Sequence, residues 1–587
     1  MRHLQDQTVL ILGLGASGLA MARWWVRHGA SVTVADTREA PALLATLRQE
    51  LPAVKFVSGA FTPDLVQGSA VRAVYRSPGL APAVIAPVVD AARAMGLPVG
   101  GELDLFSRAL ADLREVSATE VVKDHLVPPE SPLSDASDIS DASDATDAVD
   151  SLEGEAALAA DASGDIEEMS ASDVVEGAPV SEDAGEDAAL PALLAPAPAE
   201  QAAGYRPVVL AITGTNGKTT VTSLVGQLVQ RAGKTVAVAG NIGPTLLDTL
   251  SAHLDADTLP QVWVLELSSF QLADAQDFEP TAAVVLNVTQ DHLDWHGDMD
   301  AYVAAKARIF GRSTFMLLNR DDPRVMEMLP TPVKVRLRPP QVRPHSTFGA
   351  GEPQRPGDYG IETVNGMAWL VRAAQADETI KRRKGEEVEL HIQRLMPLDA
   401  LRIRGRHNAT NALAALGLAV AAGCSLAPML HGLREYRGEP HRVESIAVVN
   451  DVEYFDDSKG TNVGATAAAL AGLGAERKLV VILGGEGKGQ DFSPLAEPVS
   501  HHARAVVLIG KDAPLIRSAL QASQVALLDA ASMQEAVSLA AAQAHTGDAV
   551  LMSPACASFD MFDNYEHRAQ VFCDAVQALA QEQGVVL

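Results

Sequence analysis

The chain has very few cysteines. Only Cys424, Cys556 and Cys573 occur in 587 residues, far apart and without a C-x-x-C pair. Neither a disulfide framework nor a cysteine zinc site is therefore expected. This cysteine usage is typical of a protein of the reducing cytosol, so we expect a cytoplasmic location.

Long apolar runs and aromatic residues are also scarce. No run reaches the ~20 apolar residues that a membrane-spanning helix needs, so membrane insertion is not expected. Aromatic residues make up only 4% of the chain although hydrophobic residues make up 47%, which predicts a sizeable core built mostly of Ala, Val and Leu. At roughly 100–200 residues per domain, the length predicts three to four domains.

Basic residues are outnumbered by acidic ones. The chain has 46 Lys and Arg against 75 Asp and Glu, for a formal net charge of −29. Non-specific binding to nucleic acid or to anionic membranes needs clustered Lys and Arg. Neither kind of partner is therefore expected.

The negative charge is concentrated in one segment. Residues 115–187 contain 22 of the 75 acidic residues and a single basic one, Lys123, and Asp recurs at every third position from Asp135 to Asp150. Such a segment has too little apolar surface to offset its ordering entropy, and its charges repel one another. We predict a disordered insertion over residues 116–203. An acidic docking arm for an unknown partner is the alternative.

The rest of the chain alternates short apolar runs with helical patterns, which predicts an α/β fold with parallel sheets. We expect three domains, over residues 1–115, 204–437 and 438–587, with a hinge near Arg437 and Gly438. Strands are expected at 9–12, 31–35, 208–212, 262–265, 282–286, 479–483, 505–509 and 549–552.

A G-x-G-x-x-G pattern lies near the N-terminus, at residues 13–18. Gly13, Gly15 and Gly18 follow an expected strand and begin an expected helix that runs through Trp25, and Asp36 ends the next strand. The pattern predicts that a diphosphate binds at the helix N-terminus, without specifying the nucleotide. The alternative is a tight strand-to-helix turn without a ligand.

A second glycine-containing loop follows the insertion. Residues 213–220 read Thr-Gly-Thr-Asn-Gly-Lys-Thr-Thr, directly after an apolar strand. Backbone N–H groups of such a loop cradle ATP phosphates, Lys218 neutralises them, and the Thr219 hydroxyl faces Mg²⁺. The match is incomplete, because the full pattern has Gly at the position of Ile212.

Three further polar residues follow expected strands or lie on helices. Glu266 at a strand end suits a hard metal ion, His292 lies in Asn287–Asp294, and Lys306 lies in a helical pattern. Each has an ordinary alternative: an exposed Glu at a helix start, a structural His and a surface Lys. We interpret residues 321–324, Asp-Asp-Pro-Arg, as a loop.

Read in order, these motifs resemble those of the Mur ligases, the ATP-dependent amide-bond ligases of peptidoglycan precursor synthesis. The resemblance rests on residues 213–220, 241–243, 266–272, 287–294, Lys306, 405–411 and 457–462. Residues 266–272, 484–493 and 551–560 are most similar to the branch of the family that adds D-glutamate.

The resemblance implies a fold and a reaction. The expected fold is a Rossmann-like UDP-binding domain, a central P-loop ATPase-type domain with a parallel or mixed sheet, and a Rossmann-like C-terminal domain. The expected reaction is ATP-dependent ligation of D-glutamate to UDP-N-acetylmuramoyl-L-alanine through an acyl phosphate, with release of ADP and phosphate. The partners are then small molecules, ATP is a co-substrate, two Mg²⁺ sites are expected, and a monomer is expected.

The resemblance also implies roles for individual residues. Catalytic roles are implied for Lys218, Asn241, His292 and Lys306. ATP binding is implied for Gly214, Thr215, Asn216, Gly217, Lys218, Thr219, Thr220, Asn408, Asn411, Arg442, Asp457 and Lys459. UDP-substrate binding is implied for Gly15, Ala16, Ser17, Asp36, Thr37, Arg38, Ser77, Gly79, Asn241 and His292. Metal binding is implied for Thr219, Glu266, His292 and Lys306, the last as a carbamylated lysine.

D-glutamate binding is implied for Thr461, Lys488, Ser558, Phe559 and Tyr565. Phe559 stands where the family pattern has Leu, Tyr565 where it has Phe, and Gly460 where it has Ala. Both aromatic exchanges keep apolar packing.

Three other readings remain open. A sister ligase of the same fold would use another amino acid, so the amino acid that drives phosphate release distinguishes it. A dehydrogenase domain fused to a P-loop module would bind NAD(H), which we expect to be absent. A regulatory scaffold acting through the acidic segment would lose its function when that segment is deleted.

Overall fold

The computed structural model describes residues 2–124, 204–333, 340–376, 389–475 and 477–585. Contacts divide the chain into a large unit, residues 1–118 and 190–587, and a second unit, residues 119–189. Of the second unit, only the end of helix α4 (Glu102–Asp124) is described. The helix runs past residue 116, where the sequence predicted that a disordered insertion begins. The remainder of that predicted insertion lies outside the described residues.

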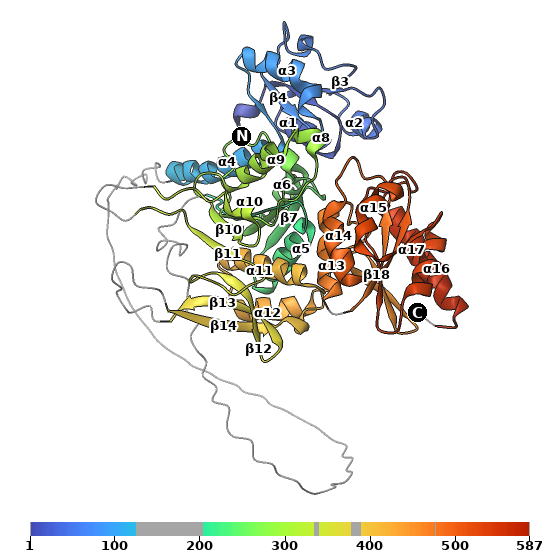
Figure 1. The fold of residues 1–587 in the computed structure, drawn as a ribbon. Coiled ribbons are helices and arrows are strands. Elements are labelled where there is room, and N and C mark those ends of the chain that lie inside the picture. The colour runs from blue at the N-terminus through green and yellow to red at the C-terminus, as the bar shows by residue number, and fades with distance from the viewer. Residues whose placement is uncertain (1, 125–203, 334–339, 377–388, 476, 586–587) are drawn as a thin grey trace, which may run out of the picture. The chain divides into compact units, whose positions relative to one another are not determined.

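The first sheet belongs to the N-terminal part of the large unit (Figure 1, blue). It is parallel throughout, in the order β3-β2-β1-β4-β5, which is the 3-2-1-4-5 order of doubly wound sheets. Its strands are β1 Thr8–Leu12, β2 Ser31–Asp36, β3 Lys55–Ser58, β4 Ala73–Arg76 and β5 Val99–Gly100. Besides α4, its helices are α1 Ala16–Arg27, α2 Leu44–Glu50 and α3 Pro82–Ala94.

Strand β1 shows why its apolar run is continuous. Val9 and Ile11 join a buried cluster that contains Trp24 of α1, whereas Leu10 joins a second cluster that contains Ile85 of α3. Successive side chains of a strand point to opposite faces, so a strand covered by helices on both faces needs apolar residues at every position.

The central sheet is also parallel throughout, in the order β11-β10-β9-β6-β8-β7. Its strands are β6 Val208–Thr213, β7 Val236–Gly240, β8 Val262–Glu266, β9 Ala282–Val285, β10 Phe315–Asn319 and β11 His345–Phe348. The helices of this part are α5 Lys218–Arg231, α6 Leu246–Asp255, α7 Ser269–Leu272, α8 Leu293–His296, α9 Met299–Ala307, α10 Pro323–Met326, α11 Arg406–Ala421 and α12 Leu426–Glu435. Leu210 and Ile212 of β6 pack with α5 and the alanine-rich α11 in one core.

A small antiparallel sheet accompanies the central one. It has the order β12-β13-β14, with strands Tyr359–Val364, Met367–Gln375 and Leu390–Pro397. Tyr359 and Leu370 belong to the same core as α5 and α11. This sheet was not predicted from the sequence.

The third sheet has the order β15-β16-β20-β17-β18-β19 (Figure 1, orange and red). Strand β15 pairs antiparallel with β16, and all other pairs are parallel. The strands are β15 Glu444–Val449, β16 Val452–Asp456, β17 Leu479–Gly484, β18 Ala503–Ile509, β19 Ala526–Asp529 and β20 Ala549–Met552. The helices are α13 Val463–Gly474, α14 Ala496–His502, α15 Ala513–Leu520, α16 Met533–Gln543 and α17 Tyr565–Glu582. The 3₁₀ helices of the described chain are η1 Arg2–Leu4, η2 Pro63–Leu65, η3 Arg308–Phe310, η4 Leu398–Ala400, η5 Ser493–Leu495 and η6 Gln521–Ser523.

The predicted α/β fold with parallel sheets is confirmed, and each predicted strand overlaps a strand of the structure. The interpretation of residues 321–324 as a loop was wrong in part, because Pro323 and Arg324 begin α10. The Asp322 carboxylate accepts hydrogen bonds from the backbone N–H groups of Arg324 and Val325, which caps that helix. Within the described residues, no helix combines the length and apolarity needed to cross a membrane.

Candidate functional site

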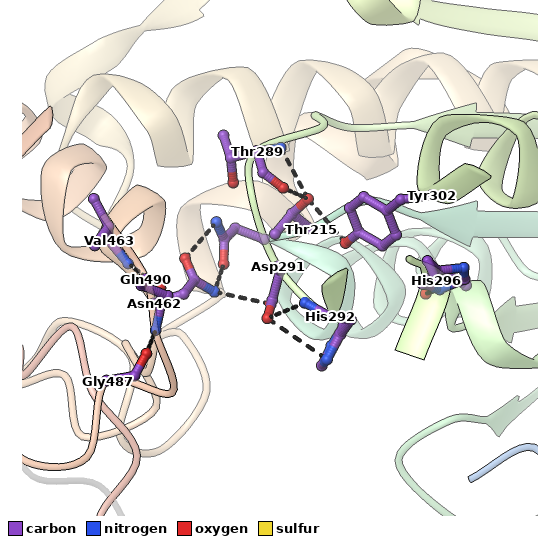
Figure 2. Close-up of polar contacts among 12 residues, drawn as sticks. Thr215, Thr289, Asp291, His292, His296, Tyr302, Asn462, Val463, Gly487 and Gln490 are labelled. Carbon is purple, nitrogen blue, oxygen red and sulfur yellow. Dashed lines mark hydrogen bonds and ion pairs between the residues drawn. The ribbon is translucent and has the colours of Figure 1, made fainter. Parts of the chain in front are cut away.

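The loop between β6 and α5 is held by residues that follow the neighbouring strand β9. The backbone N–H of Asn216 donates to Asn287 Oδ1 at 2.9 Å, and Asn287 Nδ2 donates to the Asn216 carbonyl at 3.1 Å. The Thr215 hydroxyl lies 3.1 Å from the Tyr302 hydroxyl and accepts from the Thr289 N–H at 3.0 Å (Figure 2). These contacts fix the loop that carries the predicted phosphate-binding residues.

Gly217 is required at the start of α5. Its φ is +83°, and a Cβ there would lie 2.8 Å from Asn411 Oδ1. The loop can therefore pack against α11 only because this position has no side chain.

Two lysines meet at the carbonyl of Gly214. Lys218 Nζ donates to it at 3.0 Å and to the Thr215 carbonyl at 2.9 Å, and Lys306 Nζ donates to it at 2.9 Å. Desolvation lowers the pKa of Lys218, and the nearby Glu266 carboxylate acts against that shift. Burial, followed by the charge of Lys218, holds the pKa of Lys306 well below its ordinary value. Lys306 is 1% exposed, so it is not the surface lysine that its helical position also allowed.

Glu266 ends β8 and is 3% exposed, which excludes the alternative of an exposed Glu at a helix start. Asn241 Nδ2 donates to Glu266 Oε1 at 3.0 Å. The Thr219 hydroxyl, on the first turn of α5, accepts from Arg442 Nη2 at 2.8 Å. Arg442 precedes β15, so this bond joins the phosphate-loop helix to the C-terminal part of the chain.

His292 has a left-handed backbone, with φ of +54°, and occupies the N-cap position of the short helix α8 without a side-chain capping hydrogen bond. Its ring Nδ1 lies 3.5 Å from Asp291 Oδ1, and its ring centroid lies 4.7 Å from that of Phe270. Burial is the main cause of its lowered pKa, which keeps the imidazole neutral and able to bind a metal ion or donate a hydrogen bond.

A pocket of about 120 Å³ lies beside the phosphate loop. Of the predicted ATP-binding residues, its walls contain Asn216, Gly217, Thr220, Asn408, Asn411, Arg442, Asp457 and Lys459. Residues without a predicted role also line it: Leu286, Asn287, Asn319, Phe348, His407, Thr410, Val443, Gly460, Ala465, Ala468 and Ala469. The pocket therefore combines the loops of β6 and β9 and the start of α11 with residues of the C-terminal part.

Two buried groups in this wall have shifted pKa values. Burial lowers the pKa of His407 to about 4, so the ring is neutral. Burial raises the pKa of Asp457 to about 7, although the Ser553 hydroxyl donates to its Oδ2 at 2.6 Å. No role was predicted for His407, although it lies in the Gly-Arg-His-Asn segment on which the family resemblance rests. That segment is the sequence signal that could have placed His407 in the pocket.

The glycine pattern of the first sheet forms a tight turn. Gly13 has φ of +88°, and a Cβ on Gly18 would lie 2.0 Å from the Gly13 carbonyl oxygen. The Leu14 N–H donates to Asp36 Oδ2 at 2.8 Å. Arg38 donates to both carboxylate oxygens of Asp36, and this interaction is the main cause that lowers the pKa of Asp36 to about 2.

Most of the other predicted UDP-site residues lie at the same edge of the first sheet. Gly15 precedes α1, Ala16 and Ser17 begin it, Thr37 follows β2, and Ser77 and Gly79 follow β4. Asn241 and His292 lie instead in the central part, after β7 and before α8. The end of β4 and the loop after it contact the central part. Arg76 donates to Asp274 at 2.5 Å and to the Phe270 carbonyl at 3.3 Å, and the Trp295 indole donates to the Leu80 carbonyl at 3.2 Å.

The predicted D-glutamate residues lie in loops after three neighbouring strands of the third sheet. Thr461 follows β16, Lys488 follows β17, Ser558 and Phe559 follow β20, and Tyr565 begins α17. Lys488 Nζ lies 5.7 Å from the centre of the Phe559 ring, and Lys459 Nζ lies 3.6 Å from that of Tyr565. Phe559 is 64% exposed, so it is available to a ligand.

Three sequence-family profiles match in chain order. They are the Mur ligase MurD-like N-terminal domain at residues 7–101, the Mur ligase middle domain at 212–419, and the Mur ligase glutamate ligase domain at 441–556. The chain belongs to the Mur ligase family.

Curated relatives match over the full length. The UDP-N-acetylmuramoylalanine--D-glutamate ligase of Albidiferax ferrireducens is 60% identical over 584 residues, which is 100% of this chain and 98% of the relative. The enzyme of the same name from Ralstonia nicotianae is 50% identical over 595 residues, 100% of this chain and 99% of the relative.

Among solved structures, this Mur ligase is similar to the UDP-N-acetylmuramate-alanine ligase of Thermotoga maritima, with a TM-score of 0.46 and 16% identity. That match covers 98% of this chain and all of the other. The pseudomurein peptide ligase type C of Methanothermus fervidus matches with a TM-score of 0.45 and 15% identity, over 98% of this chain and all of the other.

Proposed function

We propose that this Mur ligase joins D-glutamate to UDP-N-acetylmuramoyl-L-alanine at the expense of ATP, in peptidoglycan precursor synthesis. The observation that carries the proposal is the pocket where Asn216 and Gly217, from the loop between β6 and α5, meet Arg442, Asp457 and Lys459 from the C-terminal part. The name shared by relatives up to 60% identical over the whole chain supports the choice of substrates.

The chemistry activates a carboxylate that is otherwise a poor acylating agent. An oxygen of the L-alanyl carboxylate attacks the γ-phosphorus of ATP, and ADP leaves. The amine of D-glutamate then attacks the acyl phosphate, loses a proton, and expels phosphate. Lys218 offsets the repulsion between the two anions of the first step, and Asn241 holds the substrate beside the γ-phosphate.

The oxygen donors near the loop between β6 and α5 are suited to magnesium. The Thr219 hydroxyl and the Glu266 carboxylate are hard oxygen donors of the kind that Mg²⁺ prefers, and we propose that they hold the ion that accompanies ATP. Bound Mg²⁺ would supply positive charge to the transferring phosphoryl group.

We propose a second Mg²⁺ site at His292 and Lys306. An ammonium group repels Mg²⁺, whereas a carbamylated lysine offers a carboxylate-like oxygen. Carbamylation requires a neutral amine, and the lowered pKa of the buried Lys306 favours that form. The proximity of Lys218 disfavours two ammonium groups and favours the same modification.

We propose that D-glutamate binds at the loops of the third sheet and that the nucleotide sugar binds at the edge of the first sheet. We propose that Lys488 pairs with the side-chain carboxylate of D-glutamate and that the neighbouring loops contribute Thr461, Ser558, Phe559 and Tyr565. The UDP group is proposed to bind at the turn of residues 13–18, with contacts from the other predicted UDP-site residues: Gly15, Ala16, Ser17, Asp36, Thr37, Arg38, Ser77, Gly79, Asn241 and His292. Arg38 would have to leave Asp36 to contact a phosphate.

We further propose a cytoplasmic monomer whose partners are these small molecules, with domains over 1–115, 204–437 and 438–587. The acidic residues 116–203 are proposed to be dispensable for the reaction, because none of the motifs lies in them. A chain lacking residues 125–203, joined by a short Gly-Ser linker, should keep near-normal activity.

The proposed function is tested by ATP-dependent phosphate release with UDP-N-acetylmuramoyl-L-alanine and one of four amino acids: D-Glu, L-Glu, L-Ala or meso-diaminopimelate. Release with D-Glu alone is expected. Release with another amino acid would keep the ATP chemistry and overturn the assignment of Lys488 and Ser558. The Lys218→Ala variant serves as the inactive control.

A further inference from the structure

The N-terminus of α13 contacts two loops of the central part through one side chain. Asn462 Nδ2 donates to Asn216 Oδ1 at 3.0 Å and to Asp291 Oδ2 at 3.4 Å, and its Oδ1 accepts from Asn216 Nδ2 at 3.2 Å (Figure 2). The same Oδ1 accepts from the Ala465 N–H at 2.9 Å and so caps α13. Asn462 is 6% exposed. One buried amide therefore binds its own helix, the phosphate loop and the loop that carries His292.

Helix α13 lies close to the central part because two positions facing it are glycines. A Cβ on Gly464 would lie 2.6 Å from Thr289 Oγ1, and a Cβ on Gly472 would lie 2.6 Å from His407 Nδ1. The two glycines are eight residues apart and share one face of the helix. Thr289 follows β9 and His407 begins α11, so this face contacts the same elements that form the nucleotide pocket.

On its other side, the N-terminus of α13 holds the loop of Lys488. Gln490 Oε1 accepts from the Val463 N–H at 3.1 Å, and Gln490 Nε2 donates to the Gly487 carbonyl at 3.0 Å (Figure 2). Gln490 Nε2 also donates to the Ala555 carbonyl at 3.5 Å. Lys488 has a left-handed backbone, with φ of +52°. A tight turn with this backbone depends on such contacts for its shape.

We propose that Asn462 and Gln490 are positioning residues that tie the D-glutamate-binding loop to the ATP-binding loop across the N-terminus of α13. The proposal rests on the proposed function, because it takes Lys488 as a ligand of D-glutamate. Neither side chain touches the reacting atoms. The Gln490 side chain joins the Gly487 carbonyl, next to Lys488, to the Val463 N–H. Asn462, the residue before Val463, fixes the same helix start to Asn216. The two residues act in series, so breaking either link frees the amino-acid loop from the phosphate loop.

Two nearly isosteric variants break the links and keep the local fold. Asn462→Asp keeps the oxygen that caps Ala465 but places a carboxylate against Asn216 Oδ1 and the Asp291 carboxylate. Gln490→Glu keeps the acceptor for Val463 N–H but places an oxygen against the Gly487 carbonyl. The control is Ser532→Ala, which removes the cap of α16, since the Ser532 hydroxyl accepts from Glu535 N–H at 3.2 Å without an interdomain contact.

Steady-state kinetics give the first readout. Each variant should raise the KM for D-glutamate about tenfold, the factor expected from one buried hydrogen bond replaced by a repulsive contact. Gln490→Glu should leave the KM for ATP unchanged, whereas Asn462→Asp should raise it as well, because Asn216 lies in the ATP loop. The double variant should have the same KM for D-glutamate as Asn462→Asp alone, because the links are in series. Ser532→Ala should change only the melting temperature.

Hydrogen–deuterium exchange gives a readout that needs no amino acid. Adding ATP with Mg²⁺ to the wild-type protein should increase the protection of residues 486–490, and Asn462→Asp should abolish that increase. Any one of three results would overturn the proposal. They are a KM for D-glutamate within twofold of wild type in either variant, multiplicative effects on this KM in the double variant, and no ATP-dependent protection in the wild type. If the wild-type protein shows no D-glutamate-dependent turnover, the proposed function is refuted. If ATP still protects this loop in the wild type and no longer does so in Asn462→Asp, the proposed coupling between the two loops stands without it.

Discussion

The buried carboxyl of Glu102 should make the stability of this ligase depend on pH. Glu102 begins α4, is 3% exposed, and accepts from the Leu247 N–H at the start of α6 at 3.0 Å. It therefore lies where the N-terminal and central parts meet. Burial raises its pKa from the usual 4.5 to about 7.

The sign and size of the effect follow from this shift. The folded state binds the proton more tightly than the unfolded state, so the contribution of Glu102 is fully present below about pH 4.5 and is lost as the pH rises through about 7. At 1.36 kcal/mol per unit, the shift corresponds to a loss of about 3 kcal/mol between pH 4.5 and pH 8. Glu102→Gln keeps the acceptor for Leu247 and cannot ionise, so it should not suffer this loss.

Urea unfolding of the full chain at pH 5 and pH 8, followed by tryptophan fluorescence, tests this prediction. The stability lost between pH 5 and pH 8 should be about 2.5 kcal/mol smaller in Glu102→Gln than in the wild type, because part of the loss already occurs below pH 5. Glu50→Gln is the matched control, because Glu50 is a largely exposed carboxylate paired with Arg23 and its pKa is lowered, not raised. Equal pH dependence in Glu102→Gln and the wild type would show that Glu102 does not cause this loss of stability.

Three further predictions concern single positions. Lys218→Ala should lower kcat for ATP-dependent phosphate release about 10²–10³-fold while the circular dichroism spectrum stays unchanged, and retained activity would contradict its role. Gly18→Ala should lower stability by about 1–3 kcal/mol in thermal unfolding, because the new Cβ would lie 2.0 Å from the Gly13 carbonyl oxygen, and an unchanged melting temperature would contradict the geometry. Removing dissolved CO₂ should lower the activity of the wild type, with recovery on adding bicarbonate, and a Lys306→Arg variant should show low activity that bicarbonate does not restore.

The strands and loops that depend on contiguous residues could be predicted from the sequence. The apolar runs at β1, β6 and β20 are buried on both faces, which is why they contain no polar alternation. The strand-to-helix connection at residues 213–218 could be predicted because a strand, its glycines and Lys218 are adjacent in the chain.

Features formed by distant residues were not predictable in the same way. The pocket wall includes Phe348 and His407, which the fold brings to the phosphate loop from other elements. The burial of Glu266 depends on neighbouring strands that its own sequence does not specify. Helix α10 is different, because Asp322 followed by Pro323 is a usual helix start and its signal was present in the sequence.

The most direct test of the central claim is to identify the product. Purified protein is incubated with UDP-N-acetylmuramoyl-L-alanine, ATP, Mg²⁺ and D-glutamate, and the nucleotide fraction is analysed by mass spectrometry. We expect a UDP-sugar heavier by one glutamyl residue, formed together with one ADP, and absent with L-glutamate or with Lys218→Ala. An unchanged UDP-sugar in the presence of consumed ATP, or a product carrying another amino acid in a competition mixture, would contradict this claim.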